Sequence, residues 1–342
     1  MRHRVGHSWS TTAVAERARP VPETMRAAVI DATGSPELFR IATIPTPSKV
    51  NAEYLVKVVA AGINPIDAKT RAGRGVAAAI PGFPSVLGFD FSGVVLQAPF
   101  EASELQAGDE VYGMTSFPRT PGSYAEYAVV SSLSLAKKPT TLSHVEAAGV
   151  PLAALTAWGM VVDVAKAHEG QRILIHAGSG GVGHFAVQFA RYFGAHVTAT
   201  GSTRNLPWLR ELGAADTVDH TTTRFEDVVR QVDVVIDLIG NVLDDTGSRS
   251  LSVLRPGGLI VNAPTGSWPT FIDEAHDAGV RATTYKVAPD GGTLDTISRL
   301  LESGDVRVFV DQIFDLDAVS AAHTALETGH ARGKIVLKVA EG

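Results

Sequence analysis

The residues with the clearest chemical meaning are six consecutive positions, Gly178-Ser179-Gly180-Gly181-Val182-Gly183, which match the spacing G-x-G-x-x-G. An apolar segment at 173–175 precedes them, and a segment whose apolar residues recur at helical spacing follows. In this context the first glycine permits a tight turn, the second lets the backbone approach a pyrophosphate, and the third lets helix and strand pack closely. The helix start also presents free amides and a partial positive charge to that anion. We therefore predict a dinucleotide-binding site at 178–183.

The segment after the next predicted strand, at 197–200, decides which dinucleotide is preferred. It contains Gly201-Ser202-Thr203-Arg204 and no carboxylate. An acid at this place holds the ribose 2′-hydroxyl of NADH, whereas hydroxyls and a guanidinium can bind the 2′-phosphate of NADPH. The prediction is NADPH rather than NADH. A solvated loop arginine is the alternative interpretation of Arg204.

Two later loops are predicted to line the same crevice, because the carboxyl ends of parallel strands meet at one edge of a sheet. Leu238 and Gly240 lie where a strand predicted at 234–238 ends, and Ala263 follows one predicted at 259–261. These residues are candidates for cofactor contact. The alternative is that they are ordinary loops after strands.

Composition restricts the class of protein. The chain has 342 residues, 45% of them hydrophobic, with a formal charge of −6, which suits two globular domains and gives no basic surface for nucleic acid. It has no cysteine, which excludes disulfides, thiol nucleophiles and thiolate metal sites and is compatible with the cytoplasm, the predicted location. No apolar stretch approaches the roughly 20 residues of a membrane span, so no membrane contact is predicted.

The pattern along the chain divides it into four regions. Residues 1–24 lack the apolar segment of a secretory signal and are predicted to be a disordered extension. Residues 25–142 carry short strand patterns broken by Gly and Pro, which predicts a mainly β domain. Between 143 and 287, after two helices that meet at Pro151, strands and helices alternate, which predicts an α/β domain with a doubly wound parallel sheet. Residues 288–342 add a helix, an extended segment, a second helix and a final strand.

After Met25, a series of short segments in a fixed order resembles the zinc-independent, quinone oxidoreductase-like branch of the medium-chain dehydrogenase/reductase family. The resemblance implies a GroES-like β-barrel catalytic domain at 25–142 that receives the segment 288–342. It also implies a Rossmann domain at 143–287, a substrate cleft between the two, and a homodimer. Besides the glycine-rich loop, the segments are Gly62-Ile63-Asn64-Pro65-Ile66-Asp67, Leu87-Gly88-Phe89-Asp90-Phe91-Ser92-Gly93, Gly108-Asp109-Glu110-Val111, Gly122-Ser123-Tyr124-Ala125-Glu126-Tyr127, Thr156-Ala157-Trp158, Leu254-Arg255-Pro256-Gly257-Gly258 and Gly333-Lys334-Ile335-Val336-Leu337.

The resemblance further implies an enzyme that works without zinc. Zinc-dependent relatives carry Cys where this chain has Asn64, and Gly-His-Glu where it has Gly88-Phe89-Asp90. Without those ligands a tetrahedral zinc site cannot be assembled there. Alcohol oxidation needs a Lewis acid, so a metal-free site favours reduction of an acceptor that is already polarised. The expected reaction is hydride transfer from NADPH to a quinone or to the β-carbon of an α,β-unsaturated carbonyl.

Four residues are assigned roles by the same resemblance. Asn64 would donate a hydrogen bond to the developing oxyanion, although it could instead cap the turn before Pro65. Asp67 would orient its neighbours, and Thr156 would touch the nicotinamide. Lys334 would reach the cofactor or the substrate, unless it is an ordinary surface lysine at the start of a strand.

Three alternatives stay open. Enoyl-thioester reductases of mitochondrial type, and many quinone reductases, carry a Tyr soon after the Asn-Pro segment. Its absence from 72–76 argues against an acyl-thioester substrate and indicates a differently shaped cleft. Ser179 resembles the serine of a nucleophile elbow and would make the chain a hydrolase, but the complete dinucleotide motif favours the reductase. A non-catalytic NADPH-binding protein is the third alternative. The candidate proton donors of a reductase are Tyr112, Tyr124 and Tyr285. The candidate histidines of a hydrolase triad are His220, His276, His323 and His330.

Overall fold

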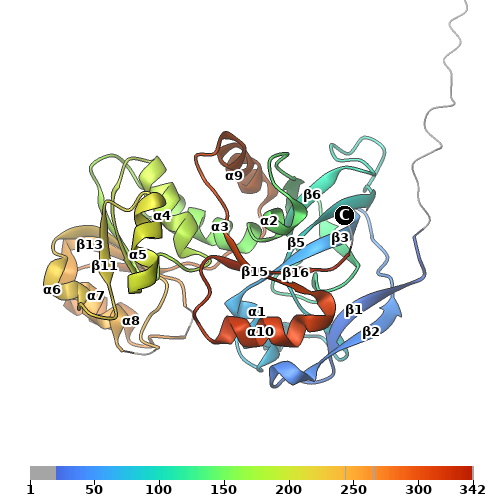
Figure 1. The fold of residues 1–342 in the computed structure, drawn as a ribbon, viewed down its shortest axis with the longest axis horizontal. Helices are drawn as coiled ribbons and strands as arrows, with labels where there is room; N and C mark the ends of the chain where they lie inside the picture. The colour runs from blue at the N-terminus through green and yellow to red at the C-terminus, as the bar shows by residue number, and fades with distance from the viewer. Residues whose placement is uncertain (1–20, 243, 265, 341–342) are drawn as a thin grey trace, which may run out of the picture.

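The computed structural model describes residues 21–242, 244–264 and 266–340. Most of the extension predicted at 1–24 lies outside the described residues, and strand β1 (Thr24–Ile30) begins at the last position of that range. The chain forms two lobes, one built on a parallel sheet and one on mainly antiparallel sheets (Figure 1). Helix α3 (Pro151–Trp158) and the C-terminal strands β15 (Val310–Asp315) and β16 (Lys334–Lys338) lie where the lobes meet.

The parallel sheet has six strands in the order β11-β10-β9-β12-β13-β14, and every neighbouring pair is parallel. Its central strands consist mainly of buried apolar residues, because helices cover both faces of the sheet. The doubly wound α/β sheet predicted for this part of the chain is confirmed. The strands are β9 (Arg172–Ile175), β10 (His196–Gly201), β11 (Asp216–Asp219), β12 (Val232–Asp237), β13 (Leu254–Asn262) and β14 (Arg281–Thr284).

The sequence predicts five of these six strands and misses β14. It pairs with β13 alone, at the edge of the sheet, and its sequence Arg281-Ala282-Thr283-Thr284 has no buried residue. Because an edge strand is covered on fewer sides than a central one, it lacks the apolar run by which the other strands are recognised.

The helices begin where local chemistry favours a helix start. Ser143 caps α2 by accepting a hydrogen bond from the amide of Glu146, and Pro151 occupies the first turn of α3. The two helices predicted to meet at Pro151 are therefore confirmed. The helices, besides α3, are α1 (Pro65–Arg71), α2 (His144–Ala148), the π-helical turn η4 (Gly159–Val164), α4 (Gly183–Tyr192), α5 (Leu206–Glu211), α6 (Phe225–Val228), α7 (Thr246–Ser250), α8 (Phe271–Asp277), α9 (Gly291–Ser303) and α10 (Val319–Glu327).

The second lobe contains a seven-stranded sheet in the order β15-β16-β3-β5-β6-β8, with β7 also paired to β3, and a three-stranded sheet β2-β1-β4. The C-terminal strand β16 returns to this lobe and pairs antiparallel with β3, with Ile335 opposite Ile63. The remaining strands are β2 (Phe39–Pro45), β3 (Glu53–Ile63), β4 (Ser85–Val86), β5 (Asp90–Gln97), β6 (Glu110–Met114), β7 (Tyr127–Ser131) and β8 (Leu135–Lys137).

The order of these strands brings the ends of three strands together. Strand β3 lies between β16 and β5, so the end of β3, the start of β5 at Asp90 and the start of β16 at Lys334 are neighbours. Gly62 allows α2 to close over them, since a methyl group at position 62 would lie 2.3 Å from the carbonyl oxygen of Ala148. The site described next is built on this junction.

Candidate active site

The glycine-rich loop joins β9 to α4 in a conformation that needs glycine. A methyl group at position 183 would lie 2.1 Å from the carbonyl oxygen of Ala177, and one at position 178 would lie 3.0 Å from the side chain of Ala199. Within the described chain, the amides of Ser179, Gly181 and Val182 have no hydrogen-bond acceptor. Free amides at a helix start are what a pyrophosphate needs, so the loop fits a dinucleotide.

The segment after β10 lies directly beside this loop. The side-chain amide of Asn205 donates hydrogen bonds to the hydroxyls of Ser179 and Ser202, at 3.1 and 3.2 Å. Thr203 donates its hydroxyl proton to Asp219 at the end of β11, at 2.5 Å. Asn205 links the two predicted cofactor segments, and sequence analysis does not single it out.

The loops after β12 and β13 are held together by a buried carboxylate at the end of β12. Asp237 accepts hydrogen bonds from the amides of Ile239 and Gly240, at 2.9 and 2.8 Å, and from the side chain of Asn262 at 2.7 Å. Leu238, Gly240 and Ala263 therefore lie at the carboxyl edge of the sheet, on the side to which the glycine-rich loop belongs. The sequence signal for Asp237 is an acid that ends an apolar strand.

Helix α4 also fastens the glycine-rich loop to the C-terminal segment. His184 bonds the carbonyl oxygen of Gly180 through Nδ1 at 3.0 Å and accepts the amide proton of Phe309 at Nε2, at 3.4 Å. One turn later, Gln188 bonds both backbone groups of Arg307, at 2.9 and 2.8 Å. Burial lowers the pKa of His184 to about 4, so the ring is neutral and can donate at one nitrogen while accepting at the other. We refer to His184 and Gln188 as the α4 clasp.

At the junction of the three strand ends, the side-chain amide of Asn64 is held from two sides. Its Nδ2 donates to Asp90 Oδ2 at 2.8 Å, and its Oδ1 accepts a short hydrogen bond from Lys334 Nζ. Lys334 also donates to the carbonyl oxygen of Ile63 at 2.8 Å and lies 3.7 Å from Asp90. A cation on one side and a carboxylate on the other fix the orientation of the amide. One N–H of Nδ2 remains without an acceptor among the described residues.

Lys334 is buried and is not a surface lysine. Its side chain is 3% exposed, and a methyl group placed on Gly181 would lie 3.2 Å from its Cδ. The aliphatic part of Lys334 therefore lies beside the glycine-rich loop, and its ammonium group bonds Asn64. Burial lowers the pKa of Lys334 and raises that of Asp90, while their opposite charges act the other way.

Asp90 extends the cluster to helix α3. Its Oδ1 accepts the amide proton of Leu152 at 2.8 Å, in the first turn of the helix. Thr156 lies one turn further along and donates its hydroxyl proton to the carbonyl oxygen of Leu152 at 2.6 Å. Thr156 thus lies one helical turn from the contact between Leu152 and Asp90. Its hydroxyl is hydrogen-bonded within α3.

Behind Asn64, Asp67 is held by a second set of buried groups. Its Oδ2 accepts the backbone N–H of Asn64 at 2.8 Å and the hydroxyl proton of Tyr124 at 3.0 Å. Tyr124 in turn contacts His323 Nε2 at 3.3 Å, and Arg71 contacts His323 Nδ1 at 3.5 Å. Arg71 can only donate and the carboxylate accepts, so every hydrogen bond in this series runs toward Asp67. Burial raises the pKa of Asp67 to about 7 and lowers the pKa of His323 to about 3.

The chain is similar to known proteins over most of its length. The alcohol dehydrogenase GroES-like domain matches residues 50–140, and the zinc-binding dehydrogenase domain matches residues 212–337. The NAD(P)H oxidoreductase RTN4IP1, mitochondrial, of Danio rerio is 34% identical over 93% of this chain and 92% of its own length. The NADPH-dependent alkenal/one oxidoreductase, chloroplastic, of Arabidopsis thaliana is 36% identical over 93% of this chain and 80% of its own. The chain belongs to the medium-chain dehydrogenase/reductase family.

Structural similarity places it in the quinone oxidoreductase-like branch of that family. The quinone oxidoreductase from Coxiella burnetii has 38% sequence identity and a TM-score of 0.87, covering 93% of this chain and all of that one. The expected combination of a GroES-like domain with a Rossmann-like parallel sheet is confirmed. The resemblance of the ordered sequence segments to the quinone oxidoreductase-like branch is therefore confirmed.

Two of the three tyrosines considered as proton donors are already engaged in this medium-chain dehydrogenase/reductase. Tyr112 is buried and donates to the carbonyl oxygen of Leu294 at 2.9 Å, and Tyr124 donates to Asp67. Tyr285 is half-buried and lies against Gly159, where a methyl group would meet its ring at 1.9 Å. Of the three, only Tyr285 has a hydroxyl without a hydrogen-bond partner among the described residues.

Neither a serine triad nor a metal cluster is found in the part of the chain that the structure describes. The hydroxyl of Ser179 accepts a hydrogen bond from Asn205, and no described histidine is bonded to it. His323, one candidate for a hydrolase triad, is bonded to Tyr124 and Arg71 in the other lobe. No group of three or more His, Cys, Asp or Glu side chains is arranged to hold a metal ion among the described residues.

Proposed function

We propose that this chain is an NADPH-dependent reductase that works without zinc and transfers hydride to a quinone or an α,β-unsaturated carbonyl. The observation that carries the proposal is the buried cluster of Asn64, Asp90 and Lys334, which connects through Lys334 to the glycine-rich loop. NADPH, when bound, supplies the hydride. Its pyrophosphate would be held by the loop at 178–183, and its ribose by residues 201–204.

The protein groups in the cluster can stabilise negative charge on an acceptor oxygen. The free N–H of Asn64 Nδ2 is a fixed donor, because Asp90 and Lys334 hold the amide in one orientation. The ammonium group of Lys334 adds positive charge at the same place. Groups that are already oriented lower the barrier, because little reorganisation accompanies the reaction. Asn64 is 2% exposed, so its amide is shielded from bulk water.

The same cluster supports the proposal of a zinc-free site. The zinc ligands of related enzymes are replaced here by Asn64 and by Phe89-Asp90. Phe89 offers no ligand atom, and Asn64 Oδ1 and Asp90 Oδ2 face the ammonium group of Lys334. A divalent cation at this place would meet the positive charge of Lys334 at close range.

Preference for NADPH over NADH is supported by the groups after β10. Ser202 and Arg204 can bind a phosphate, and β10 does not end in an acid. The carboxylate of Asp219, at the end of the neighbouring strand β11, is bonded to Thr203 and Thr221. The hydrogen bond from Thr203 lowers its pKa, and both of its oxygen atoms already accept hydrogen bonds, so Asp219 does not replace the acid that would hold the 2′-hydroxyl of NADH.

The experiment is to follow NADPH oxidation with quinones, alkenals and enoyl thioesters, with NADH as the control donor. The proposal expects turnover of quinones or alkenals with NADPH exceeding that with NADH. Turnover of enoyl thioesters alone would assign the related thioester activity instead. Saturable NADPH binding with no turnover of any acceptor would identify a non-catalytic binding protein and overturn the proposal.

A homodimer and a cytoplasmic location stay predictions. In the part of the chain that the structure describes, no helix has the length and apolar character needed to cross a membrane.

A further inference from the structure

The residue that precedes the glycine-rich loop has a strained backbone. Ala177 has a φ of 49°, in the left-handed region that residues other than glycine rarely adopt. Such a conformation persists where surrounding contacts hold it. Thr200, near the end of β10, provides two of these contacts. Its hydroxyl oxygen accepts the amide proton of Ala177 at 3.1 Å, and its carbonyl oxygen accepts the amide proton of Gly178 at 2.9 Å. Thr200 therefore fixes the start of the loop.

The hydroxyl of Thr200 is bonded in turn to the ring of His176. This ring is 1% exposed and packs edge-on against Phe225, with the ring centroids 4.6 Å apart. Its Nδ1 lies 3.4 Å from Thr200 Oγ1, and its Nε2 lies 2.9 Å from the hydroxyl oxygen of Ser250 in α7. One buried side chain therefore connects β10 with α7 at the point where the glycine-rich loop begins.

The partners of the ring assign its proton. Ser250 donates its own hydroxyl proton to the carbonyl oxygen of Thr246 at 2.7 Å, so its oxygen is left to accept the N–H of His176 Nε2. Burial lowers the pKa of His176 to about 4, so the ring is neutral. A neutral imidazole that donates at one nitrogen accepts at the other. Nδ1 therefore accepts the hydroxyl proton of Thr200, and the oxygen of that hydroxyl accepts the amide proton of Ala177.

This series gives the hydroxyl of Thr200 one orientation. A threonine hydroxyl rotates to suit its partners. Because Nδ1 of His176 takes its proton, a lone pair of the oxygen stays directed at the amide of Ala177. Without an acceptor at Nδ1 the hydroxyl would turn toward another group, and the strained residue would lose part of its support.

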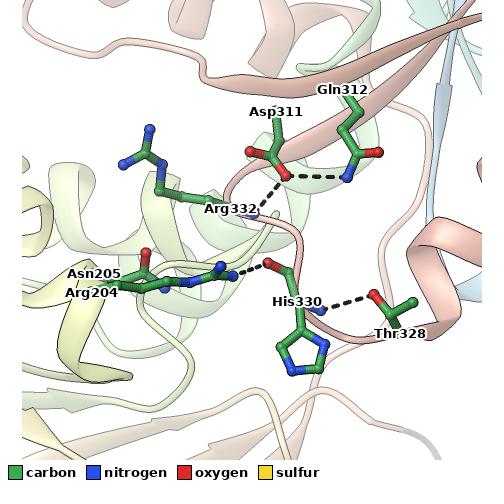
Figure 2. Close-up of a pocket in the computed structure, with 7 residues that line it drawn as sticks. All are labelled: Arg204, Asn205, Asp311, Gln312, Thr328, His330 and Arg332. Atoms are coloured by element: carbon green, nitrogen blue, oxygen red, sulfur yellow. Dashed lines mark hydrogen bonds between the residues drawn. The ribbon is translucent and has the colours of Figure 1, made fainter.

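The middle of the glycine-rich loop is held from a different direction. Asn205, which lines the cavity shown in Figure 2, donates to the hydroxyl of Ser179 at 3.1 Å. Asn205 belongs to the segment after β10, whereas His176 ends the run of residues that leads from β9 into the loop. The loop is thus fixed at two places by two separate sets of side chains.

We propose that His176 is a positioning residue for cofactor binding. Through Thr200 it holds Ala177, and with it the free amides that follow, in the arrangement that receives a pyrophosphate. The inference rests on the proposed function and deepens it, because it names the side chain that keeps the phosphate-binding loop in its working conformation. His176 itself has no contact with the cofactor in this account and acts through the hydroxyl of Thr200.

Two substitutions at position 176 separate the roles of the two ring nitrogens. The side-chain oxygen of asparagine reaches the place of Nδ1, and the side-chain nitrogen of glutamine reaches the place of Nε2. His176→Asn keeps an acceptor for Thr200 and should bind NADPH within about threefold of the wild-type affinity, whereas His176→Gln should weaken NADPH about tenfold, a loss typical of one hydrogen bond. Fluorescence titration of the purified full-length protein measures both dissociation constants.

The melting temperature distinguishes positioning from general stability. Each variant loses one partner of a buried ring, so both melting temperatures should fall by similar amounts. A merely structural role would make the affinity for NADPH follow the melting temperature in both variants. His276→Asn and His276→Gln, at an exposed position, are the matched controls and should change neither quantity.

A second pair of variants leaves the ring in place and is informative even if changes at position 176 prevent folding. Thr200→Ser keeps the hydroxyl and should leave the affinity for NADPH within about threefold, whereas Thr200→Val removes the hydroxyl and should weaken NADPH about tenfold. Combining Thr200→Val with His176→Gln should add little further loss, because both changes remove the same hydrogen-bonded connection.

Three outcomes overturn the inference. Equal NADPH affinities of His176→Asn and His176→Gln would mean that the acceptor at Nδ1 has no role. Equal affinities of Thr200→Ser and Thr200→Val would remove the hydroxyl from the account. Fully additive losses in the double variant would mean that the two side chains act independently. A wild-type protein that binds neither NADPH nor NADH would instead end the proposed function itself, whereas wild-type binding of NADPH combined with any of the three outcomes ends the inference about His176 alone.

Discussion

Asn64 takes part in two sets of hydrogen bonds that come from distant parts of the chain. Its side chain is fixed by Asp90 and Lys334, and its backbone N–H is held by Asp67. Asn64 occupies the N-cap position of α1, as the alternative interpretation expects, and Asp67 accepts its backbone N–H, while its side-chain amide is bonded to Asp90 and Lys334. Because the side-chain amide of Asn64 is held in one orientation by Asp90 and Lys334, we treat Asn64 as the donor to the acceptor oxygen.

Replacing Asn64 by Ala should lower kcat by about 100-fold, a loss typical of removing one fixed donor to an oxyanion. The affinity for NADPH should stay within about twofold, because the loop amides and Arg204 are untouched. Steady-state kinetics with the best acceptor and a binding titration measure the two quantities. Asn51→Ala, at an exposed turn, is the matched control. An unchanged kcat in the Asn64 variant would remove this residue from the mechanism.

At the scale of elements, the α4 clasp connects cofactor loop and C-terminal segment. Gln188 satisfies both backbone groups of Arg307, and His184 joins Gly180 to Phe309. Phe309 then accepts the amide proton of Lys334 at 2.8 Å. The helix that begins at the glycine-rich loop therefore sets the position from which Lys334 reaches Asn64.

Gln188→Leu should lower the free energy of unfolding by about 1–3 kcal/mol, because both backbone groups of Arg307 lose their partner in a partly buried place. Chemical denaturation at neutral pH measures the change. Gln97→Leu, at the exposed end of β5, should alter the free energy of unfolding by less than about 0.5 kcal/mol. Equal effects of the two substitutions would mean that the clasp contributes no stability.

Across the whole molecule, three buried histidines link stability to pH. Burial lowers the pKa of His176 and His184 to about 4 and that of His323 to about 3. In the unfolded chain a histidine takes up a proton below about pH 6.5. As pH falls from about 6.5 to 4, the unfolded state therefore binds more protons than the folded state, and the free energy of unfolding must fall. Asp67, with its raised pKa, acts in the opposite direction between about pH 4 and 7.

The expected acid destabilisation is on the order of 1–3 kcal/mol for each buried histidine, and the buried carboxyl groups of Asp67 and Asp90, whose pKa values are raised, offset part of it. Urea denaturation between pH 7 and pH 4 measures it. His323→Gln should make the pH dependence shallower, while His276→Gln, at an exposed position, should leave it unchanged. A free energy of unfolding that rises as pH falls through this range would contradict the assignment of neutral, buried rings.

How far the sequence predicts this molecule depends on how local the determining contacts are. The glycine-rich loop is recognisable because strand, turn and helix are contiguous, and the central strands because each is a run of apolar residues. Strand β14 and the interactions of Asp90, Tyr124 and His323 are not recognisable in this way. Tyr124 and His323 lie 199 positions apart in the sequence, and Lys334 and Asn64 lie 270 positions apart. Such pairs depend on how the strands are ordered, which no local pattern specifies.

The central claim is that free amides of the loop at 178–183 bind the pyrophosphate of NADPH. Titration of the purified protein with NADPH, followed by cofactor fluorescence, tests it most directly, with Gly183→Ala as the matched variant. The account predicts saturable binding to the wild-type protein, weaker binding of NADH, and no saturable binding to the variant, whose added methyl group would meet the carbonyl oxygen of Ala177 at 2.1 Å. A wild-type protein with no saturable signal for either nucleotide, or a folded variant that binds as tightly, would contradict it.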